Sequence, residues 1–293
     1  MPQLGTFNWV GGKYKKLNWL IPLIEPPGIT SFVDAFGGSA VVLLNRKKTR
    51  HEVYNDLDRN AVNFFRVLRD QPEELFRLLE LTPYSKEEFV ISKLPVAEDH
   101  PFGDLEAARR FFCSISMSYS GTRSTFGHGT TSTGNGPMPA RLHIGRIDRL
   151  MNTNIVSRLR EVEMWNRPAI EVIEKFKEKP TALIYLDPPY EPSTWVETSS
   201  KYHTPPMTKE DHKAMLEAIA DANCRVAISG YDNEVYNKVL EGWRTSTKEV
   251  QVTVGGKHEN ARRTETEVLW MNYDQNGWLY AENDVLGINA ELL

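Results

Sequence analysis

Short apolar runs alternate along the chain with longer stretches in which apolar residues recur every three or four positions. The runs predict buried strands, and the recurring pattern predicts helices that cover them. The first half opens with a strand at 29–36, a turn leading into a helix at 37–47, a strand at 51–56 and a helix at 57–70. Because strands that alternate with helices form parallel sheets, we expect an α/β fold.

The second half of the chain returns to the same pattern. Residues 181–187 and 225–232 predict two further buried strands, and 208–222 predicts a helix between them. Residues 246–273 predict a β-hairpin that closes the fold. The α/β segments therefore stand at both ends of the chain.

A mostly helical insertion separates these two parts. Residues 72–118 predict helices, and residues 120–141, rich in Gly, Ser and Thr, predict a loop. A helix, a strand and another helix are expected over roughly 146–177. The predicted domains are an α/β domain made of 1–60 and 161–293 and an inserted helical region at 61–160.

Overall composition excludes several classes of protein. The 293 residues carry a net charge of −4, and 25% are charged, which is ordinary for a soluble globular protein. Cys113 and Cys224 lie far apart in sequence, which favours a reduced compartment over a disulfide scaffold or zinc site. The chain begins without an apolar signal region, and no apolar run approaches the ~18 residues of a membrane span.

The charges are distributed unevenly within the insertion. Residues 71–108 contain nine acidic residues and three Lys or Arg, whereas residues 109–160 contain eight Arg, no Lys and one acidic residue. Arginine binds phosphate groups and guanine edges through two parallel hydrogen bonds, which lysine cannot do. The arginine-rich stretch therefore predicts contact with phosphate or nucleic acid, although a solvated helical face is the simpler alternative.

A glycine-rich turn follows the first predicted strand, in "FVDAFGGSA" at 32–40. Such a turn lets a cofactor approach the backbone at the carboxyl end of a sheet, although a tight strand–helix junction explains it nearly as well. Asp56 ends the next strand, where a carboxylate can bind a ribose diol; the alternative is a helix cap, because Asp56 and Asp58 both precede a helix. Together these features favour a cofactor that contains adenosine.

The motif "DPPY" at 187–190 directly follows the buried run "ALIYL". The Asp187 carboxylate and the Pro188 carbonyl can accept hydrogen bonds from an exocyclic amine of a nucleobase, which makes its nitrogen more nucleophilic. The prolines have a fixed φ and no competing N–H, and Tyr190 offers a ring on which a flipped base can stack. A simple strand stop and turn is the alternative.

The ordered set of motifs resembles the DNA adenine methyltransferases of the Dam type, which use S-adenosylmethionine. The motifs that carry the resemblance are "NWVGGKY" (8–14), "DAFGGSAVVLLN" (34–45), "ND" (55–56), "DPPY" (187–190), "YHTPPMT" (202–208), "VAISGYD" (226–232) and "TETEVLWMN" (264–272). The resemblance implies a doubly wound, Rossmann-like methyltransferase sheet with an inserted, mainly helical target-recognition domain. It implies no metal.

The resemblance also implies roles for individual residues. S-adenosylmethionine would be bound by residues from several motifs: Trp9, Lys13, Asp34, Phe36, Gly38, Asp56 and Asp187. Gly38 would make the close turn, and Asp56 would hold the ribose. The catalytic set would be Asp187, Pro188, Pro189 and Tyr190. Without the resemblance, Trp9 would be taken for a core residue and Lys13 for a solvated residue at a helix start.

The insertion departs from the family in its target-recognition segment. "YSGTRS" (119–124) retains the aromatic residue and a glycine, but the asparagine is missing and the arginine is displaced, so the recognised DNA sequence stays open. The candidate DNA-binding residues are Tyr119, Arg123, Arg141, Lys257, Arg262 and Arg263. The last three lie in a basic loop at 255–263, for which an exposed hairpin loop is an equal alternative.

These observations predict a site-specific methyltransferase that transfers a methyl group from S-adenosylmethionine to the exocyclic amine of adenine in duplex DNA, by base flipping. The alternatives are the same fold acting on an RNA base, cytosine's amine or a protein amide, and a catalytically silent DNA-binding regulator. The resemblance implies double-stranded DNA as partner, no membrane, a cytoplasmic location in bacteria or for a phage-encoded protein, and a cognate restriction endonuclease as a candidate partner. A monomer is favoured.

Overall fold

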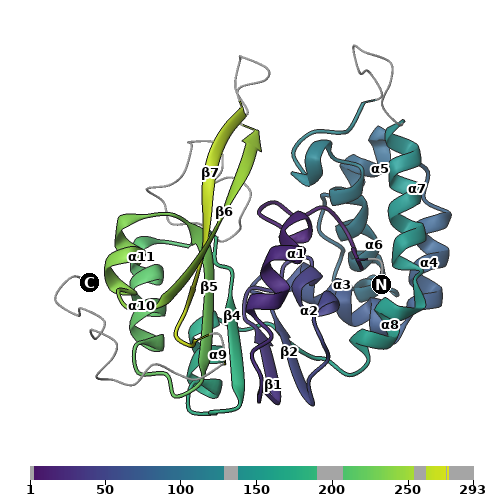
Figure 1. The fold of residues 1–293 in the computed structure, drawn as a ribbon. Helices are drawn as coiled ribbons and strands as arrows, with labels where there is room; N and C mark the ends of the chain where they lie inside the picture. The colour runs from purple at the N-terminus through teal and green to yellow at the C-terminus, as the bar shows by residue number, and fades with distance from the viewer. Residues whose placement is uncertain (1–2, 129–137, 190–206, 254–261, 275, 277–293) are drawn as a thin grey trace. The chain divides into compact units, whose positions relative to one another are not determined.

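A mostly parallel sheet of seven strands, flanked by helices, forms the framework of the protein (Figure 1). The structure is a computed structural model, and it describes residues 3–128, 138–189, 207–253, 262–274 and 276. The strand order is β3-β2-β1-β4-β5-β7-β6. The expected α/β fold with a Rossmann-like sheet is therefore confirmed.

The centre of the sheet is parallel and its far edge is antiparallel. Strand β1 pairs in parallel with β2 and β4, and β4 with β5, whereas β7 runs antiparallel to both β5 and β6. The strands span Ser31–Asp34 (β1), His51–Asn55 (β2), Glu163–Trp165 (β3), Ala182–Leu186 (β4), Arg225–Tyr231 (β5), Arg244–Thr253 (β6) and Arg262–Met271 (β7). All five residues of β4 are buried, as its continuous apolar run predicts.

The chain divides into two compact units. Unit 1 comprises Met1–Lys15, Gly37–Asn45 and Asp58–Asn166, and unit 2 comprises Lys16–Phe36, Arg46–Leu57 and Arg167–Leu293. One boundary between them falls inside the glycine-rich motif, between Phe36 and Gly37. The predicted division into functional domains at 1–60, 61–160 and 161–293 places the N-terminal segment differently and stays a prediction.

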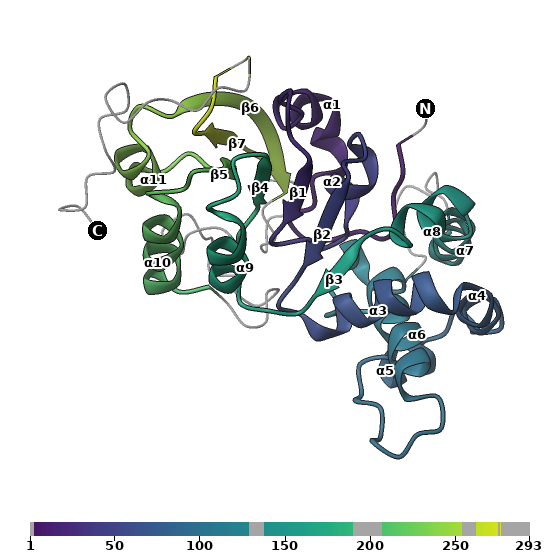
Figure 2. The same cartoon turned by 90° about the horizontal axis from the view of Figure 1, so that it is seen from below.

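Unit 2 holds most of the sheet and the helices that cover it. These are α1 (Leu17–Leu20), α9 (Ala169–Phe176), α10 (Lys209–Ile219) and α11 (Glu234–Val239), with a 3-10 turn at Ile21–Leu23. Helices α9, α10 and α11 lie on one face and α1 on the other (Figure 2). Side chains along β7 point alternately to these two faces. Trp270 packs edge-on against Tyr236 of α11 on one face, and Glu267 pairs with Lys16, just before α1, on the other.

Unit 1 is mainly helical and has an aromatic core. Its helices are α2 (Val41–Asn45), α3 (Arg59–Asp70), α4 (Pro72–Glu80), α5 (Lys86–Ile91), α6 (Gly103–Ser116), α7 (Pro139–Leu150) and α8 (Thr153–Leu159), with a 3-10 turn at Tyr119–Gly121. Another 3-10 turn, Tyr14–Lys16, includes the last two residues of the N-terminal segment and the first residue of unit 2. Phe7 inserts between the helices, with ring centroids 5.4 Å from Phe64 of α3 and 5.5 Å from Phe111 of α6. The N-terminal segment is therefore part of this core.

Two local predictions need correction. Helix α7 begins at Pro139, so the last residues of the segment predicted as a loop at 120–141 are helical; proline is well tolerated at the first position of a helix because its missing N–H would have no partner there. Helix α11 was not predicted at all, since its six residues are too few to show a clear period.

The described part of the chain also bears on the cysteines, on membrane-spanning helices and on metal-binding clusters. Cys113 and Cys224 are buried and form no disulfide. Among the described helices, none combines the length and apolar character needed to cross a membrane. Within the same residues, no three His, Cys, Asp or Glu side chains are grouped so that they could hold a metal ion.

Candidate active site

Three carboxylates lie at the carboxyl ends of three neighbouring strands of unit 2. Asp34 is the last residue of β1, Asp56 directly follows β2, and Asp187 directly follows β4. Asp34 is in register with Tyr54 and Tyr185, which lie two residues before Asp56 and Asp187. Because these strands are parallel, their carboxyl ends meet at one edge of the sheet, and we call Asp34, Asp56 and Asp187 the acidic edge.

The environment of the acidic edge differs from one residue to the next. The Asp34 side chain is almost fully buried, with 1% of its surface exposed, whereas Asp56 and Asp187 are half-buried. Phe36, two residues after β1, is also half-buried. Asp56 and Asp187 are therefore the two carboxylates of the acidic edge that stay partly exposed to solvent.

Asn55 is a structural centre of this edge, and no role was predicted for it. Its side chain is buried, and its Nδ2 donates hydrogen bonds to the carbonyls of Ala35 (2.9 Å) and Arg167 (3.0 Å). The Arg167 backbone N–H donates to Asn55 Oδ1 (3.0 Å). One amide thus ties the ends of β1 and β2 to the segment that precedes α9. The available signal was a polar residue inside an otherwise buried strand.

Asp58, and not Asp56, caps the following helix. The Asp58 carboxylate accepts a hydrogen bond from the Asn60 backbone N–H (2.9 Å) at the start of α3. The alternative explanation of Asp56 as the N-cap is therefore wrong. The role of Asp56 as a ligand of a ribose stays a prediction.

The residues after β4 leave the sheet beside a buried charged network. Pro188 is buried and Pro189 is half-buried, while Tyr190 lies outside the described residues. The register of β4 and β5 ends at Leu186 and Ile228, which places Ser229 next along β5. Ser229 Oγ donates to Glu267 Oε1 (3.1 Å), and Lys16 Nζ pairs with the other carboxylate oxygen.

Glu267 is fully buried, so its charge requires the partners just described. Sequence reasoning assigned no role to Ser229, Glu267 or Lys16. The signal that could have found them is the acidic residue at an inward position of the closing strand.

Gly38 and Trp9 are packed closely together in unit 1. Gly38 has a φ of +48°, and a Cβ there would lie 2.7 Å from Trp9 Nε1 and 2.9 Å from Trp9 Cδ1. Only glycine combines this backbone conformation with so close an approach. The close turn predicted at Gly38 is therefore present, and its neighbour is Trp9.

Neither Lys13 nor Trp9 has the environment that the simpler explanation of each residue predicts. Lys13 is 1% exposed, and its Nζ donates to the Gly11 carbonyl (3.4 Å), so a solvated lysine at a helix start is excluded. Trp9 is half-buried instead of lying in the core. Their predicted roles at the cofactor site stay predictions.

A compact turn at 118–127 carries the predicted recognition residues Tyr119 and Arg123. Tyr119 is 71% exposed. Arg123 has a left-handed backbone, with a φ of +60°, which is uncommon for a residue with a side chain. Its guanidinium lies over the Phe111 ring (5.3 Å to the centroid) and pairs with Asp58 (3.7 Å).

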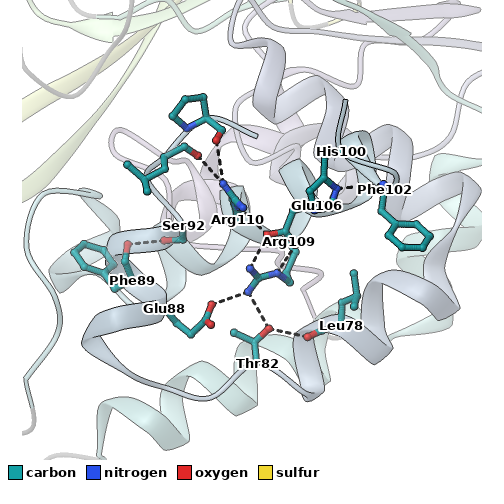
Figure 3. Close-up of polar contacts among 12 residues, drawn as sticks. Leu78, Thr82, Glu88, Phe89, Ser92, His100, Phe102, Glu106, Arg109 and Arg110 are labelled. Carbon is teal, nitrogen blue, oxygen red and sulfur yellow. Dashed lines mark hydrogen bonds and ion pairs between the residues drawn. The ribbon is translucent and has the colours of Figure 1, made fainter. Parts of the chain in front are cut away.

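Most arginines of the basic stretch have partners inside the protein. Arg109 donates to Glu106 (2.7 Å) and Glu88 (2.9 Å), and Arg110 donates to Glu106 (2.7 Å) and the Pro95 carbonyl (3.0 Å) (Figure 3). The others with such partners are Arg123, Arg146 and Arg158. Part of the stretch therefore neutralises the acidic helices, and contact with phosphate or nucleic acid stays a prediction for the stretch.

The remaining arginines of this stretch, Arg141, Arg149 and Arg160, are exposed. Arg141 lies in the first turn of α7, on the solvent side. Of the predicted basic loop, Lys257 lies outside the described residues. Arg262 and Arg263 begin β7, and their side chains are not described.

Comparison with known proteins gives two findings. A family model described as D12 class N6 adenine-specific DNA methyltransferase matches residues 9–255. A segment of 65 residues is 42% identical to the modification methylase StsI of Streptococcus sanguinis, over 22% of this chain and 10% of that protein. The chain therefore matches about a tenth of that relative's length.

Proposed function

Since the chain belongs to the D12 class of N6 adenine-specific DNA methyltransferases, we propose that it transfers a methyl group from S-adenosylmethionine to the exocyclic amine of adenine in duplex DNA. The observation that supports this most directly is the acidic edge, in which Asp187 is half-buried and is followed at once by two prolines. The Dam-type subgroup is part of the proposal and is supported by the order of the motifs.

The residues at hand fit the proposed cofactor chemically. Carboxylates suit the hydroxyl groups of a ribose and the cationic end of an amino acid, and Asp56 and Asp34 end adjacent strands. Phe36, two residues after β1, and Gly38 are further proposed contacts, the first in unit 2 and the second in unit 1. Trp9 and Lys13 complete the proposed set.

When bound, S-adenosylmethionine supplies the methyl group. The protein's part is to make a weak nucleophile react: the Asp187 carboxylate and the Pro188 carbonyl accept hydrogen bonds from the two amine hydrogens. These bonds favour a pyramidal nitrogen whose lone pair is available, and the Asp187 carboxylate is the base for the proton that the nitrogen releases. The flipped base stacks on Tyr190.

For DNA, we propose contacts from Tyr119, Arg123 and Arg141, with Lys257, Arg262 and Arg263 as phosphate contacts. Tyr119 and Arg141 are exposed in the described turn and helix, as such contacts require. Because one relative is named a modification methylase, a cognate restriction endonuclease is also part of the proposal.

Transfer of a labelled methyl group from S-adenosylmethionine to unmethylated plasmid DNA tests this function. The matched control is Asp221→Ala, which removes a carboxylate that is 70% exposed and pairs with Lys177. We expect label on adenines within one recurring short sequence, a rate reduced at least about 10²-fold in Asp187→Ala, and an unchanged rate in the control.

Several outcomes would contradict the proposal. Label on an RNA control or on cytosine would assign a different acceptor. Wild-type turnover by Asp187→Ala would remove Asp187 from the mechanism. Binding of cofactor and duplex without any transfer would identify a silent DNA-binding regulator.

A further inference from the structure

Two tight glycine contacts in unit 1 meet on consecutive residues of the N-terminal segment. Gly38 packs against Trp9, as described above. Gly121, in the compact turn at 118–127, packs against Asn8: a Cβ at Gly121 would lie 2.7 Å from the Asn8 carbonyl oxygen and 3.1 Å from Asn8 Cβ. Neither junction has room for a methyl group, so a shift at one end displaces the other.

A second line of contact runs beside the first. The ring of Trp9 lies 6.2 Å from that of Phe111, centroid to centroid, and the Arg123 guanidinium lies 5.3 Å from the Phe111 ring centroid. Gly38 and the compact turn are therefore connected through Trp9 by two routes, one through Asn8 and one through Phe111.

The compact turn is itself stiff. Tyr119 N donates to the Thr125 carbonyl and Gly127 N to the Met117 carbonyl, both at 2.8 Å, and Arg123 N donates to Ser118 Oγ at 3.1 Å. These bonds hold the turn as one body. A displacement that reaches Gly121 is therefore passed to the exposed Tyr119 and is not absorbed by the backbone between them.

We propose that Asn8 and Trp9 are positioning residues that couple cofactor binding at Gly38 to the placement of the recognition turn carrying Tyr119 and Arg123. This inference rests on the proposed function, which supplies a ligand at each end. Each ligand raises the affinity for the other, and the coupling is reciprocal because it is a difference in binding free energy.

Hydrogen exchange with S-adenosylhomocysteine as the probe tests the coupling without DNA. We expect the amides of residues 118–127 to become more protected when the probe binds, and by more than the amides of α4. Helix α4 belongs to the same unit and packs against α3, α6 and α7, so it reports global stabilisation of the unit.

A pair of glycine variants provides a second test. Gly121→Ala forces a shift against Asn8, whereas Gly28→Ala imposes the same backbone strain, at a φ of +81° against +76°, with its nearest neighbour 4.0 Å away. We expect Gly121→Ala to weaken binding of S-adenosylhomocysteine by about fivefold or more, and Gly28→Ala to leave it unchanged.

The outcomes separate this inference from the proposed function. If the wild-type protein does not bind the probe, the proposed function fails and the inference fails with it. If the probe binds but protection at 118–127 does not exceed that of α4, or if both variants bind it equally, the inference alone is overturned.

Discussion

Asn55 and Arg167 are linked by a reciprocal pair of hydrogen bonds, each 3.0 Å long, between the side-chain amide of Asn55 and the backbone of Arg167. A third bond from the same amide reaches Ala35, the residue after Asp34. Asn55 itself precedes Asp56. A single buried side chain therefore sets the positions of two of the three carboxylates of the acidic edge.

Replacing Asn55 by Ala is expected to destabilise the protein by about 2–4 kcal/mol, because three backbone groups lose their partner in a buried place. The cofactor affinity should fall as well, since Asp34 and Asp56 lose their common support. Urea unfolding and calorimetric titration measure the two effects. Asn223→Ala, which removes an exposed amide bonded to Glu178, should change neither. Stability equal to wild type in Asn55→Ala would contradict the role given to Asn55.

Two glycine-to-alanine changes in unit 1 should change the stability of the protein in opposite directions. Gly38→Ala is expected to cost about 1–3 kcal/mol, because its φ is +48° and the new Cβ would meet the Trp9 ring. Gly145→Ala should stabilise by about 0.5–1 kcal/mol, because it lies inside α7 with nothing within 4 Å of the new Cβ. Thermal unfolding decides both, and a gain for Gly38→Ala would disprove the close packing.

Arg109 is expected to be essential to the helical region. Burial favours the neutral form of Glu106, but hydrogen bonds from Arg109 and Arg110 outweigh it and lower the Glu106 pKa. Arg109→Ala leaves Glu106 and Glu88 without their main partner and should cost about 3–5 kcal/mol. Arg66→Ala, which breaks an exposed pair with Asp104, should cost at most about 1 kcal/mol. Equal losses in urea unfolding would show that burial of the Arg109 network is unimportant.

His143 should make stability depend on pH. It is buried and shares a 2.8 Å hydrogen bond with Ser116, and burial, aided by Arg146, lowers its pKa to about 4. In the unfolded chain the pKa is about 6.5, so between these values only the unfolded state binds the proton. The contribution of neutral His143 to the free energy of unfolding is therefore complete above about pH 6.5. It falls as the pH drops toward 4, by at most about 1.4 kcal/mol per pH unit.

Unfolding free energies of wild type and His143→Asn between pH 4 and pH 7.5 measure this effect. The variant should lose the part of the slope that lies between pH 4 and 6.5. Gly145→Ala supplies the control, because it changes the same helix without removing a titratable group and should keep the wild-type slope. An unchanged slope in His143→Asn would assign the acid sensitivity to other groups.

Local periodicity alone determined most of the framework. The strands that end at Asp34, near Asp56 and before Asp187 were predicted from apolar runs, because burial on both faces of a parallel sheet requires such runs. Parallel pairing then brings their carboxyl ends to one edge, so the acidic edge follows from strand order once the strands are known.

Tertiary structure decided which polar side chains are used internally. Asn55 bonds to a residue 112 positions away, and Arg109 pairs with Glu88, 21 positions away. No local pattern encodes these partners, because they depend on how separate helices and strands pack. The same holds for Gly121 against Asn8. The arginine count therefore suggested a larger basic surface than the structure has. It gave no sign that the turns at Gly38 and Gly121 are linked.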